Sequence, residues 1–363
     1  MNILYLITGL GVGGAEIITI DTANMMVKRG HRVVLVYMTG GNDLQSRIDN
    51  DIQVETLQLS KNPLSFIFGL FKFKKIVNTF APDVVHANMV HANIFNRLSR
   101  LFISFPKLIC TAHNKNEGGA LRLWWYRITN KLSDLNTNVS EEAVAYYIQK
   151  KAFSRGNSIC VYNGISLSRF KKDAILKEAS RKKYGFNNND FVFISVGRLT
   201  EAKDFSNLLQ AFNIVYNTKQ NVRLIILGEG NLRENLERQI ISLNLQDKVS
   251  LLGIKSDVES YYNMSDCFVL SSAWEGFGIV LAEAMACELP VITTNAGGCA
   301  EVVNQPKWVV PIRDSDALSK IMLHVVGMSQ SERELQGKIN RNLTLRFNIE
   351  DIVNQWEAIY KKI

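Results

Sequence analysis

The sequence predicts an α/β protein of two domains, each built from a parallel sheet with helices packed against it. The chain has 363 residues, of which 47% are hydrophobic, so it is long enough for two separate cores. Short apolar runs typical of buried strands alternate with helical patterns in both halves. We expect a first domain over residues 1–165, a linker with a short helix over 166–189, a second domain over 190–347 and a final amphipathic helix over 348–363.

The positive charge of the chain is concentrated in its first half. Residues 1–185 contain 25 Lys and Arg against 13 Asp and Glu, a net of +12, whereas residues 186–363 contain 17 against 21, a net of −4. Such an asymmetry is typical of a surface that faces a polyanion, either nucleic acid or an anionic bilayer. The sequence has no zinc-finger spacing and no aromatic RNA-binding signature, so we do not expect a nucleic-acid partner.

The sequence also indicates the compartment. No window reaches the roughly 18–20 uninterrupted apolar residues of a membrane span, and the amino terminus, which reads as a buried strand, lacks a basic leader and a cleavage site. The cysteines are odd in number and form no Cys-x-x-Cys pair, which is typical of core thiols in a cytosolic protein. They are Cys110, Cys160, Cys267, Cys287 and Cys299.

Two carboxylates flank a glycine turn in the second half of the chain. Glu275 follows the apolar run 267–272, and Glu283 lies inside the helical pattern that comes next. Gly276 and Gly278 between them let the backbone approach a ligand, and the free amides at a helix start attract a phosphate. The two carboxylates can therefore bind different hydroxyls of one ligand, although a surface turn residue and a solvated helix residue would give the same pattern.

Three further loops are expected at the same edge of the second sheet. Arg198 and Lys203 follow the strand pattern 191–196, and two cations at this place suit a diphosphate. The glycine-containing segments 228–230 and 295–298 follow two more strand patterns. Because the carboxyl ends of parallel strands meet at one edge, we expect all these loops to lie together.

The first strand is followed by a glycine loop with a different resemblance. Gly9, Gly11 and Gly14 match the dinucleotide fingerprint Gly-x-Gly-x-x-Gly. The next strand ends in residues 37–39, Tyr-Met-Thr, where a nicotinamide site would place an acidic residue for the ribose. The end of this strand therefore disfavours an NAD(P)-dependent oxidoreductase, which we keep as an alternative.

With Arg198, Lys203, the glycine turn, Glu275 and Glu283 in this order and spacing, the chain resembles the family 4 glycosyltransferases. The resemblance extends over essentially the whole chain. It implies the GT-B fold, in which two Rossmann-like domains face each other with the donor site in the cleft and the last helix crosses back onto the first domain. It also implies a retaining transferase that needs neither a metal nor another cofactor.

The resemblance assigns roles to residues of this sequence. Arg198 and Lys203 would stabilise the leaving diphosphate, Glu283 would bind the ribose and Glu275 the sugar. His113, at the end of the strand pattern 107–113, would orient the transferred sugar, and the departing phosphate oxygen would take the acceptor proton. The catalytic set is then His113, Glu275, Arg198 and Lys203, and the donor-binding set is Gly13, Gly14, Arg198, Lys203, Gly228, Gly230, Ile254, Gly278, Ile279, Val280 and Glu283.

The expected reaction moves a hexose or N-acetylhexosamine from a UDP-linked donor to a lipid-linked saccharide or oligosaccharide acceptor in lipopolysaccharide or capsule synthesis. The basic first half favours a protein held peripherally on the cytoplasmic, inner face of the plasma membrane. Alternatives are the NAD(P)-dependent oxidoreductase, a nucleotide-sugar epimerase and a non-catalytic nucleotide-sugar binder.

The segment 61–80 is apolar and basic together. Such a helix is typical of a segment that lies on a membrane surface, and more often of a domain helix with one buried stripe. Residues 124–127, Trp-Trp-Tyr-Arg, are either a second interfacial patch or packing. As a helix from Leu64, the first segment would carry Phe66, Leu70, Phe73 and Val77 on one face, with Lys72, Lys74 and Lys75 beside it.

Two candidate metal sites are set aside. His86 and His91 are five positions apart across a loop, which is poor spacing for a metal, and we expect them to be structural. Asp314 and Asp316 match the Asp-x-Asp metal motif of the other large glycosyltransferase fold. Asp314 as the cap of the helix that follows is the simpler interpretation.

Overall fold

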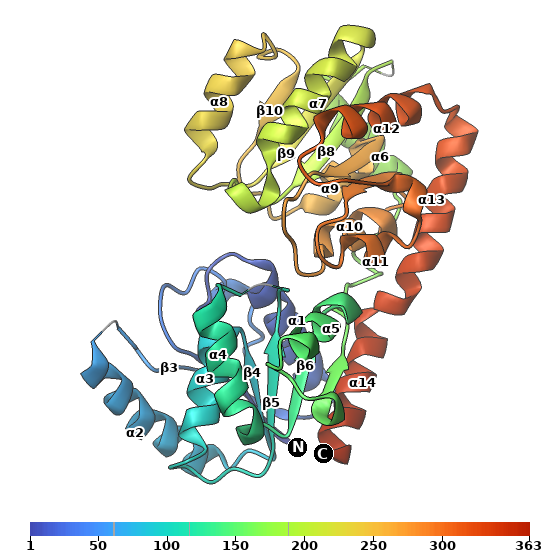
Figure 1. Ribbon diagram of the computed structural model, residues 1–363. Coiled ribbons are helices and arrows are strands. Elements are labelled where there is room, and N and C mark those ends of the chain that lie inside the picture. Colours follow the sequence, from blue (N-terminus) through green and yellow to red (C-terminus); the bar gives the residue numbers. More distant parts are fainter. Residues whose placement is uncertain (61, 116, 188) are drawn as a thin grey trace. The chain divides into compact units, whose positions relative to one another are not determined.

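The computed structural model describes residues 1–60, 62–115, 117–187 and 189–363. Its contacts divide the chain into unit 1, Met1–Gly164 with Ile349–Ile363, and unit 2, Ile165–Asn348. Each unit contains one parallel sheet and its own helices (Figure 1). The predicted α/β class is therefore confirmed.

Unit 1 is built on a sheet of seven parallel strands in the order β3-β2-β1-β4-β5-β6-β7. The order reverses between β1 and β4, so the crossover helices lie on opposite faces to either side of this point. The strands are β1 (Asn2–Ile7), β2 (Arg32–Tyr37), β3 (Gln53–Thr56), β4 (Val84–Asn88), β5 (Leu108–Ala112), β6 (Leu135–Asn138) and β7 (Ser158–Cys160).

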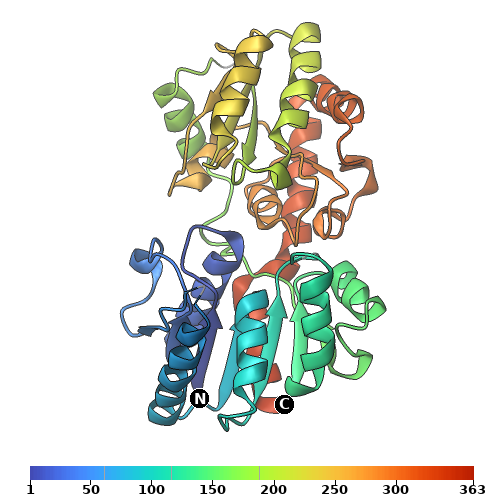
Figure 2. The same cartoon turned by 60° about the vertical axis from the view of Figure 1, so that its left-hand side comes forward.

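Helices cover both faces of this sheet, as Figure 2 shows for the face nearest the viewer. Side chains that alternate along β1 pack on the two faces of the sheet, with Tyr5 facing α1 and α14, and Leu4 and Leu6 facing α2 and α3. The helices are α1 (Gly14–Lys28), α2 (Pro63–Phe80), α3 (Val90–Ser99), α4 (Ala120–Thr129), α5 (Glu141–Gln149) and α14 (Ile349–Lys362). Short 3-10 turns lie at Gln45–Arg47, Asn130–Leu132 and Arg155–Asn157.

The last helix, α14, completes the core of unit 1. Its buried side chains are Ile352, Val353, Trp356 and Tyr360, and the Tyr360 hydroxyl lies 3.0 Å from that of Tyr5. At the rim, Glu357 accepts from His31 at 2.8 Å and from Arg29 at 3.3 Å. A segment that follows unit 2 in the chain is therefore part of the core of unit 1.

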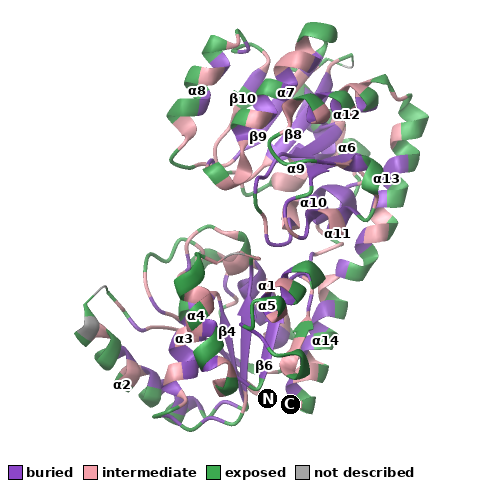
Figure 3. Ribbon diagram, in the orientation of Figure 1, coloured by how far each residue is buried: buried purple, intermediate pink, exposed green. Residues whose placement is uncertain are grey.

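Unit 2 has six parallel strands in the order β10-β9-β8-β11-β12-β13, and Figure 3 colours the strands of both sheets mainly as buried. The strands are β8 (Phe191–Val196), β9 (Val222–Leu227), β10 (Val249–Leu251), β11 (Cys267–Leu270), β12 (Val291–Thr294) and β13 (Val309–Val310). The helices are α6 (Ala174–Lys183), α7 (Phe205–Thr218), α8 (Arg233–Ser242), α9 (Val258–Met264), α10 (Ile279–Ala286), α11 (Cys299–Val303), α12 (Ser315–Gly327) and α13 (Gln330–Thr344). The 3-10 turns are Glu201–Lys203, Pro306–Trp308 and Leu345–Phe347.

The segment 166–189, which the sequence led us to expect as a linker with a short helix, belongs to unit 2 in its described part. Asp173 caps α6 by accepting from the Leu176 amide at 2.9 Å. Arg181 at the end of α6 is buried and donates to the Met264 carbonyl at 3.0 Å and to Asp266 at 3.1 Å. Buried hydrogen bonds of this kind hold the segment against the sheet, so it is not a free connection.

The helix predicted from Leu64 is α2. The face expected to carry its apolar stripe is largely the core face, as the interpretation of a domain helix with one buried stripe requires. Phe73 and Val77 are buried in the core of unit 1, and Leu70 packs against it. Phe66 remains partly exposed and meets the ring of Phe95 edge-to-face at 5.2 Å. The periodicity of the sequence could not separate the buried face of α2 from its exposed face, because apolar residues occupy both. Lys61 lies outside the described residues.

The described residues contain no helix with the length and apolarity required to cross a membrane. The segment 124–127 lies partly on the surface and partly in the core of unit 1. Trp124 is exposed, whereas Tyr126 is buried among Tyr147 and Phe153. Ser140 caps α5 by accepting from the Ala143 amide at 3.3 Å.

Candidate functional site

Four loops of unit 2 meet at the carboxyl edge of its sheet, as the sequence predicts. The loops after β8 and β9 are joined by the Leu199 amide, which donates to the Glu229 carbonyl at 2.9 Å. The loops after β11 and β12 are joined by the Gly298 amide, which donates to the Gly276 carbonyl at 3.1 Å. The segments that carry Arg198, Lys203, Glu275 and Glu283 are therefore neighbours in space.

Glu275 and Lys203 form an ion pair in this edge. Each side chain is only 17% exposed, and the Ser272 hydroxyl donates to the same Glu275 oxygen at 3.3 Å. Lys203 is thus paired with a carboxylate of its own chain. It still has donors to spare, since an ammonium group carries three.

Arg198 has a different environment from Lys203. It is exposed, and its guanidinium makes no hydrogen bond or ion pair with any residue that the structure describes. An exposed guanidinium of this kind is available for a diphosphate, which it can bind through two parallel hydrogen bonds.

The helix α10 begins at this edge with open amides. Gly278 precedes it with φ at 79°, the left-handed region that glycine adopts without strain. The amides of Ile279 and Val280 stand in the first turn, where a helix offers no acceptor to its own N–H groups. With the dipole of the helix they form a binding site for an anion.

Glu283 lies one turn into α10 and is held by a tyrosine. The Tyr262 hydroxyl donates to one of its carboxylate oxygens at 2.9 Å. Burial, and then the neighbouring Glu283, raise the pKa of Tyr262 well above its usual value, so the phenol stays a hydrogen-bond donor. The sequence offers no local signal for this contact, because Tyr262 comes from the separate helix α9.

The predicted glycines after β9 are required by packing. Gly228 has φ at 136°, and a Cβ there would lie 1.9 Å from the Gly197 carbonyl oxygen. A Cβ at Gly230 would lie 2.3 Å from the Leu199 carbonyl oxygen. The close approach of two loops therefore explains both glycines without a ligand. Ile254 in the next loop is exposed.

In unit 1, His113 lies at the end of β5 and is buried. Its Nε2 is 3.0 Å from the Asn88 amide oxygen, whereas Nδ1 has no partner within the described part of the chain. Burial lowers the pKa of His113 to about 4, so the ring is neutral near pH 7. It lines a cavity of about 20 Å³ together with Asn88 and Thr19, which is room for roughly one water molecule.

His86 on β4 is structural, as predicted. Its ring nitrogens lie 2.7 Å from the Tyr360 hydroxyl and 2.7 Å from the Thr111 hydroxyl. Burial, and secondly the neighbouring His113, lower the pKa of His86 to about 3. The neutral ring thus links the sheet to α14.

Glu117 is a residue of this region that the sequence did not reveal. One carboxylate oxygen accepts from the His113 backbone amide at 2.9 Å, and the other accepts from the Tyr126 hydroxyl at 2.9 Å. Burial raises the pKa of Glu117 to about 7, although these hydrogen bonds oppose the rise. Glu117 therefore fixes the backbone of the loop that carries His113.

Gly13 and Gly14 lie where β1 passes into α1. Gly13 is extended and precedes the helix, and Gly14 is its first residue. A Cβ at Gly13 would lie 2.4 Å from a carboxylate oxygen of Glu16. These glycines therefore lie at the start of α1, next to the carboxylate of Glu16 in the first turn of the same helix.

Family models match both halves of the chain. A model described as "Glycosyltransferase Family 4" matches residues 12–169, and one described as "Glycosyl transferases group 1" matches residues 177–342. The chain belongs to the family 4 glycosyltransferases. The resemblance inferred from Arg198, Lys203, Glu275 and Glu283 is confirmed at the level of the family.

Two curated relatives have informative names. One, from Campylobacter jejuni, is an N-acetylgalactosamine-N,N'-diacetylbacillosaminyl-diphospho-undecaprenol 4-alpha-N-acetylgalactosaminyltransferase, 29% identical over 80% of this chain and 79% of its own length. The other, from Escherichia coli, is a UDP-Gal:alpha-D-GlcNAc-diphosphoundecaprenol alpha-1,3-galactosyltransferase, 23% identical over 96% of this chain and 94% of its own. Among the curated relatives the matched share ranges from about half to nearly all of their length.

A solved structure confirms the GT-B fold. HepE from Anabaena, in complex with UDP, is 23% identical, covers 100% of both chains and superposes with a TM-score of 0.87. At this identity the likeness establishes the fold alone.

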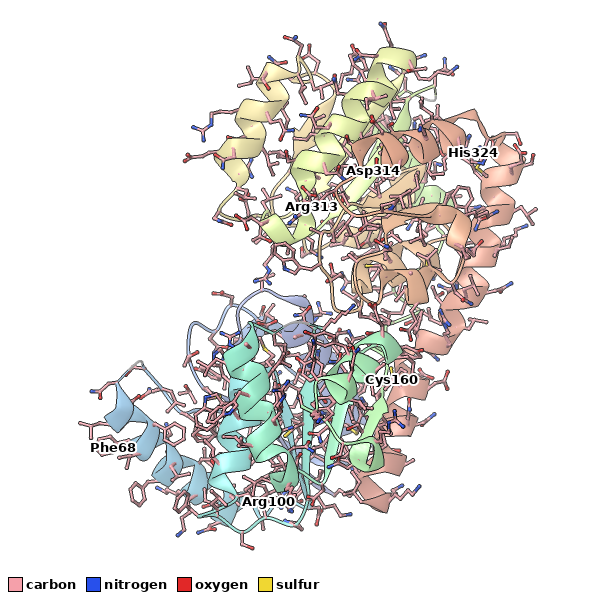
Figure 4. The ribbon with its side chains drawn as sticks, in the orientation of Figure 1. Phe68, Arg100, Cys160, Arg313, Asp314 and His324 are labelled. Carbon is pink, nitrogen blue, oxygen red and sulfur yellow. The ribbon has the colours of Figure 1, made fainter. Side chains whose placement is uncertain are left out.

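Asp314, the candidate metal ligand of the sequence, is a helix cap. Its carboxylate accepts from the Ala317 amide at 2.8 Å at the start of α12, where Figure 4 labels it. The described residues bring no three acidic, histidine or cysteine side chains together as a metal site would require.

Proposed function

We propose that the chain is a retaining glycosyltransferase that moves a hexose or N-acetylhexosamine from a UDP-linked donor to a lipid-linked diphosphate saccharide. The observation that carries the proposal is the carboxyl edge of unit 2. There the Lys203–Glu275 ion pair and the Tyr262–Glu283 contact flank the open amides at the start of α10. An anion and two hydroxyl-bearing groups of one ligand fit such an arrangement.

In this proposal the diphosphate of the donor binds between the α10 amides and two cations. The exposed Arg198 supplies one cation and Lys203 the other, without leaving Glu275. Charge-assisted hydrogen bonds are worth about 1.5–3 kcal/mol each, and more toward the charge that grows on a leaving group. Glu283, oriented by Tyr262, accepts from ribose hydroxyls, and Glu275 accepts from hydroxyls of the sugar.

The proposed chemistry balances without a dedicated base. The bond between the sugar C1 and the diphosphate oxygen breaks, and the acceptor oxygen forms a bond to C1 on the same face. The departing phosphate oxygen takes the proton of the acceptor hydroxyl. His113 is a neutral positioning group for the transferred sugar. No step uses a metal or another cofactor.

The acceptor class is proposed from the relatives. The names of two of them contain a diphospho-undecaprenol saccharide, and one of these also contains UDP-galactose. We extend both features to this chain, which would then act peripherally at the inner face of the plasma membrane in the synthesis of a surface polysaccharide. The net charge of +12 over residues 1–185 suits an anionic membrane there.

The test of the donor site is thermal stabilisation by UDP-, GDP-, CMP- and ADP-sugars, with NAD and NADP beside them. We expect a shift with UDP-sugars that Glu283→Gln abolishes and that Glu234→Gln, an exposed carboxylate on α8, retains. A shift with a nicotinamide cofactor alone would overturn the proposal.

The reaction is then tested with a diphosphate-linked saccharide acceptor carrying a short lipid. We expect a product whose anomeric configuration, read by nuclear magnetic resonance, equals that of the donor. An inverted product would refute retention, and sugar conversion without an acceptor would indicate an epimerase.

A further inference from the structure

The helix α2 exposes a stripe of large apolar side chains on the face opposite to its core contacts. Leu64, Ile67, Phe68 and Phe71 are 59%, 50%, 71% and 68% exposed. Their spacing of three, four and seven positions places them on one side of the helix. In Figure 4, Phe68 lies on the side of α2 that faces away from the sheet of unit 1.

The opposite face of α2 is mostly used in packing. Phe73, Ile76 and Val77 are buried in the core of unit 1. A Cβ at Gly69 would lie 2.2 Å from a methyl group of Leu59, so the preceding loop packs directly on the helix backbone. The exposed stripe is therefore a second apolar face of a docked helix.

Lysines continue this stripe by one further turn. Lys74 and Lys75 follow Phe71 by three and four positions and are exposed, and Lys72 beside them is half-buried. None of the three forms an ion pair with a described residue, and α2 contains no acidic residue. An apolar face bordered by unpaired lysines matches helices that lie in the interface of an anionic bilayer.

The charge pattern favours a lipid surface over a second copy of the chain. If two copies of α2 met about a two-fold axis, each stripe would face its own equivalent, and the lysines would find no carboxylate on the partner helix. Anionic headgroups complement the lysines while the acyl region accepts the rings of Phe68 and Phe71.

The position of the stripe also fits this partner. The helix α2 connects β3 to β4 and therefore begins at the carboxyl edge of the sheet. The stripe occupies the first half of α2, so it begins at this same edge, where His113 lies at the end of β5.

We propose that Leu64, Ile67, Phe68 and Phe71, together with Lys74 and Lys75, form a docking surface for an anionic lipid bilayer. The inference deepens the proposed function, because it names the place where the chain meets the membrane that would carry the acceptor. Its test requires neither donor nor acceptor, so the docking surface and the transfer reaction can fail independently.

The experiment is co-sedimentation of the full chain with vesicles. One set contains phosphatidylcholine and phosphatidylglycerol in equal parts, and the other contains phosphatidylcholine alone. At low salt we expect binding to the mixed vesicles to be about tenfold tighter or more than to the neutral ones. Phe68→Ser/Phe71→Ser should weaken binding to mixed vesicles about tenfold or more at both low and high salt.

The charge variant Lys74→Gln/Lys75→Gln should weaken binding at low salt and have little effect at high salt, where screening already removes the attraction. Matched controls come from unit 2. Ile175→Ser/Leu335→Ser removes exposed apolar side chains, Lys320→Gln/Lys338→Gln removes exposed lysines, and both should bind like the unmodified chain. Equal thermal unfolding of all variants by circular dichroism shows that the fold is retained.

The proposal is overturned if the unmodified chain does not bind mixed vesicles, or if the phenylalanine variant binds as well as the unmodified chain. Equal loss in the unit 2 controls would also refute it. If sedimentation velocity shows a dimer that Phe68→Ser/Phe71→Ser dissociates, without vesicle binding, the stripe is an interface between copies instead.

Discussion

At the scale of single residues, burial shifts the pKa values of Glu117 and His113 in opposite directions. The pKa of Glu117 rises from 4.5 to about 7, and that of His113 falls from 6.5 to about 4. Both shifts favour the neutral form in the folded chain. Stability linked to Glu117 is therefore present below pH 4.5 and lost as pH rises through 7, whereas stability linked to His113 is lost as pH falls from 6.5 through 4.

Glu117→Gln should make the chain less sensitive to alkaline pH. Gln is neutral at every pH, so the variant does not lose the stability that the unmodified chain loses as Glu117 ionises. From pH 5 to pH 8 the free energy of unfolding of the variant, relative to that of the unmodified chain, should therefore rise by about 2 kcal/mol. Urea unfolding at the two pH values measures this difference, with Glu178→Gln on the surface of α6 as the control. An identical difference from the unmodified chain at both pH values would contradict the assignment.

His86 should make the stability of the chain fall at acid pH, whereas Glu117 makes it fall at alkaline pH. His86→Leu leaves the Tyr360 and Thr111 hydroxyls without their ring partner and should cost about 1–3 kcal/mol at pH 7. Because Leu cannot be protonated, the loss of stability between pH 6.5 and pH 4 should become shallower. Acid unfolding followed by fluorescence checks this, and an unchanged acid slope would count against a neutral buried His86.

The Lys203–Glu275 pair can be tested without any substrate by a double-mutant cycle. Lys203→Met or Glu275→Gln alone leaves a mostly buried charge without its partner and should cost about 1–3 kcal/mol. The double variant should be more stable than the sum of the single losses predicts. Strict additivity in urea unfolding would show that the two side chains do not interact.

At the scale of elements, the loop before α10 is shaped by backbone contacts from the loop after β12. Gly297 has φ at 53°, and a Cβ there would lie 2.0 Å from the Glu275 carbonyl oxygen. The position of Glu275 therefore depends on a residue more than twenty positions later in the chain.

Gly297→Ala should displace this loop. We expect a loss of stability of about 1–3 kcal/mol from the strained φ and the contact with a main-chain oxygen, together with weaker donor binding in titration calorimetry. Gly327→Ala at the end of α12, where an added Cβ would meet no atom of the described residues within 4 Å, should be neutral or stabilising by up to about 1 kcal/mol. Equal effects of the two substitutions would show that Gly297 does not shape the loop.

At the scale of the whole molecule, the chain has two cores, and the last helix belongs to the first. Trp356 of α14 packs on His86 with ring centroids 4.5 Å apart. Trp308 is the corresponding buried tryptophan of unit 2. Two separate cores allow two unfolding transitions.

Trp356→Ala should lower the transition of unit 1, and Trp308→Ala that of unit 2. Each truncation should cost about 3–5 kcal/mol, or roughly 2–4 °C of transition temperature per kcal/mol. In differential scanning calorimetry UDP should raise only the transition that Trp308→Ala lowers, because the proposed donor site lies in unit 2. Transitions that move together in both variants would show that the chain unfolds as one block.

The sequence by itself determined the strands that lead into the site loops, the α10 start, the Asp314 cap and the loops that carry Arg198, Lys203, Glu275 and Glu283. These follow from local physics, since periodicity, capping and the shared edge of parallel strands depend on neighbouring residues. Only the tertiary structure decided that Tyr262 holds Glu283, that Glu117 holds the His113 loop and which apolar face of α2 is buried. These contacts join elements distant in the chain, and a helix that is apolar on two faces carries no local signal for the face that the core will cover.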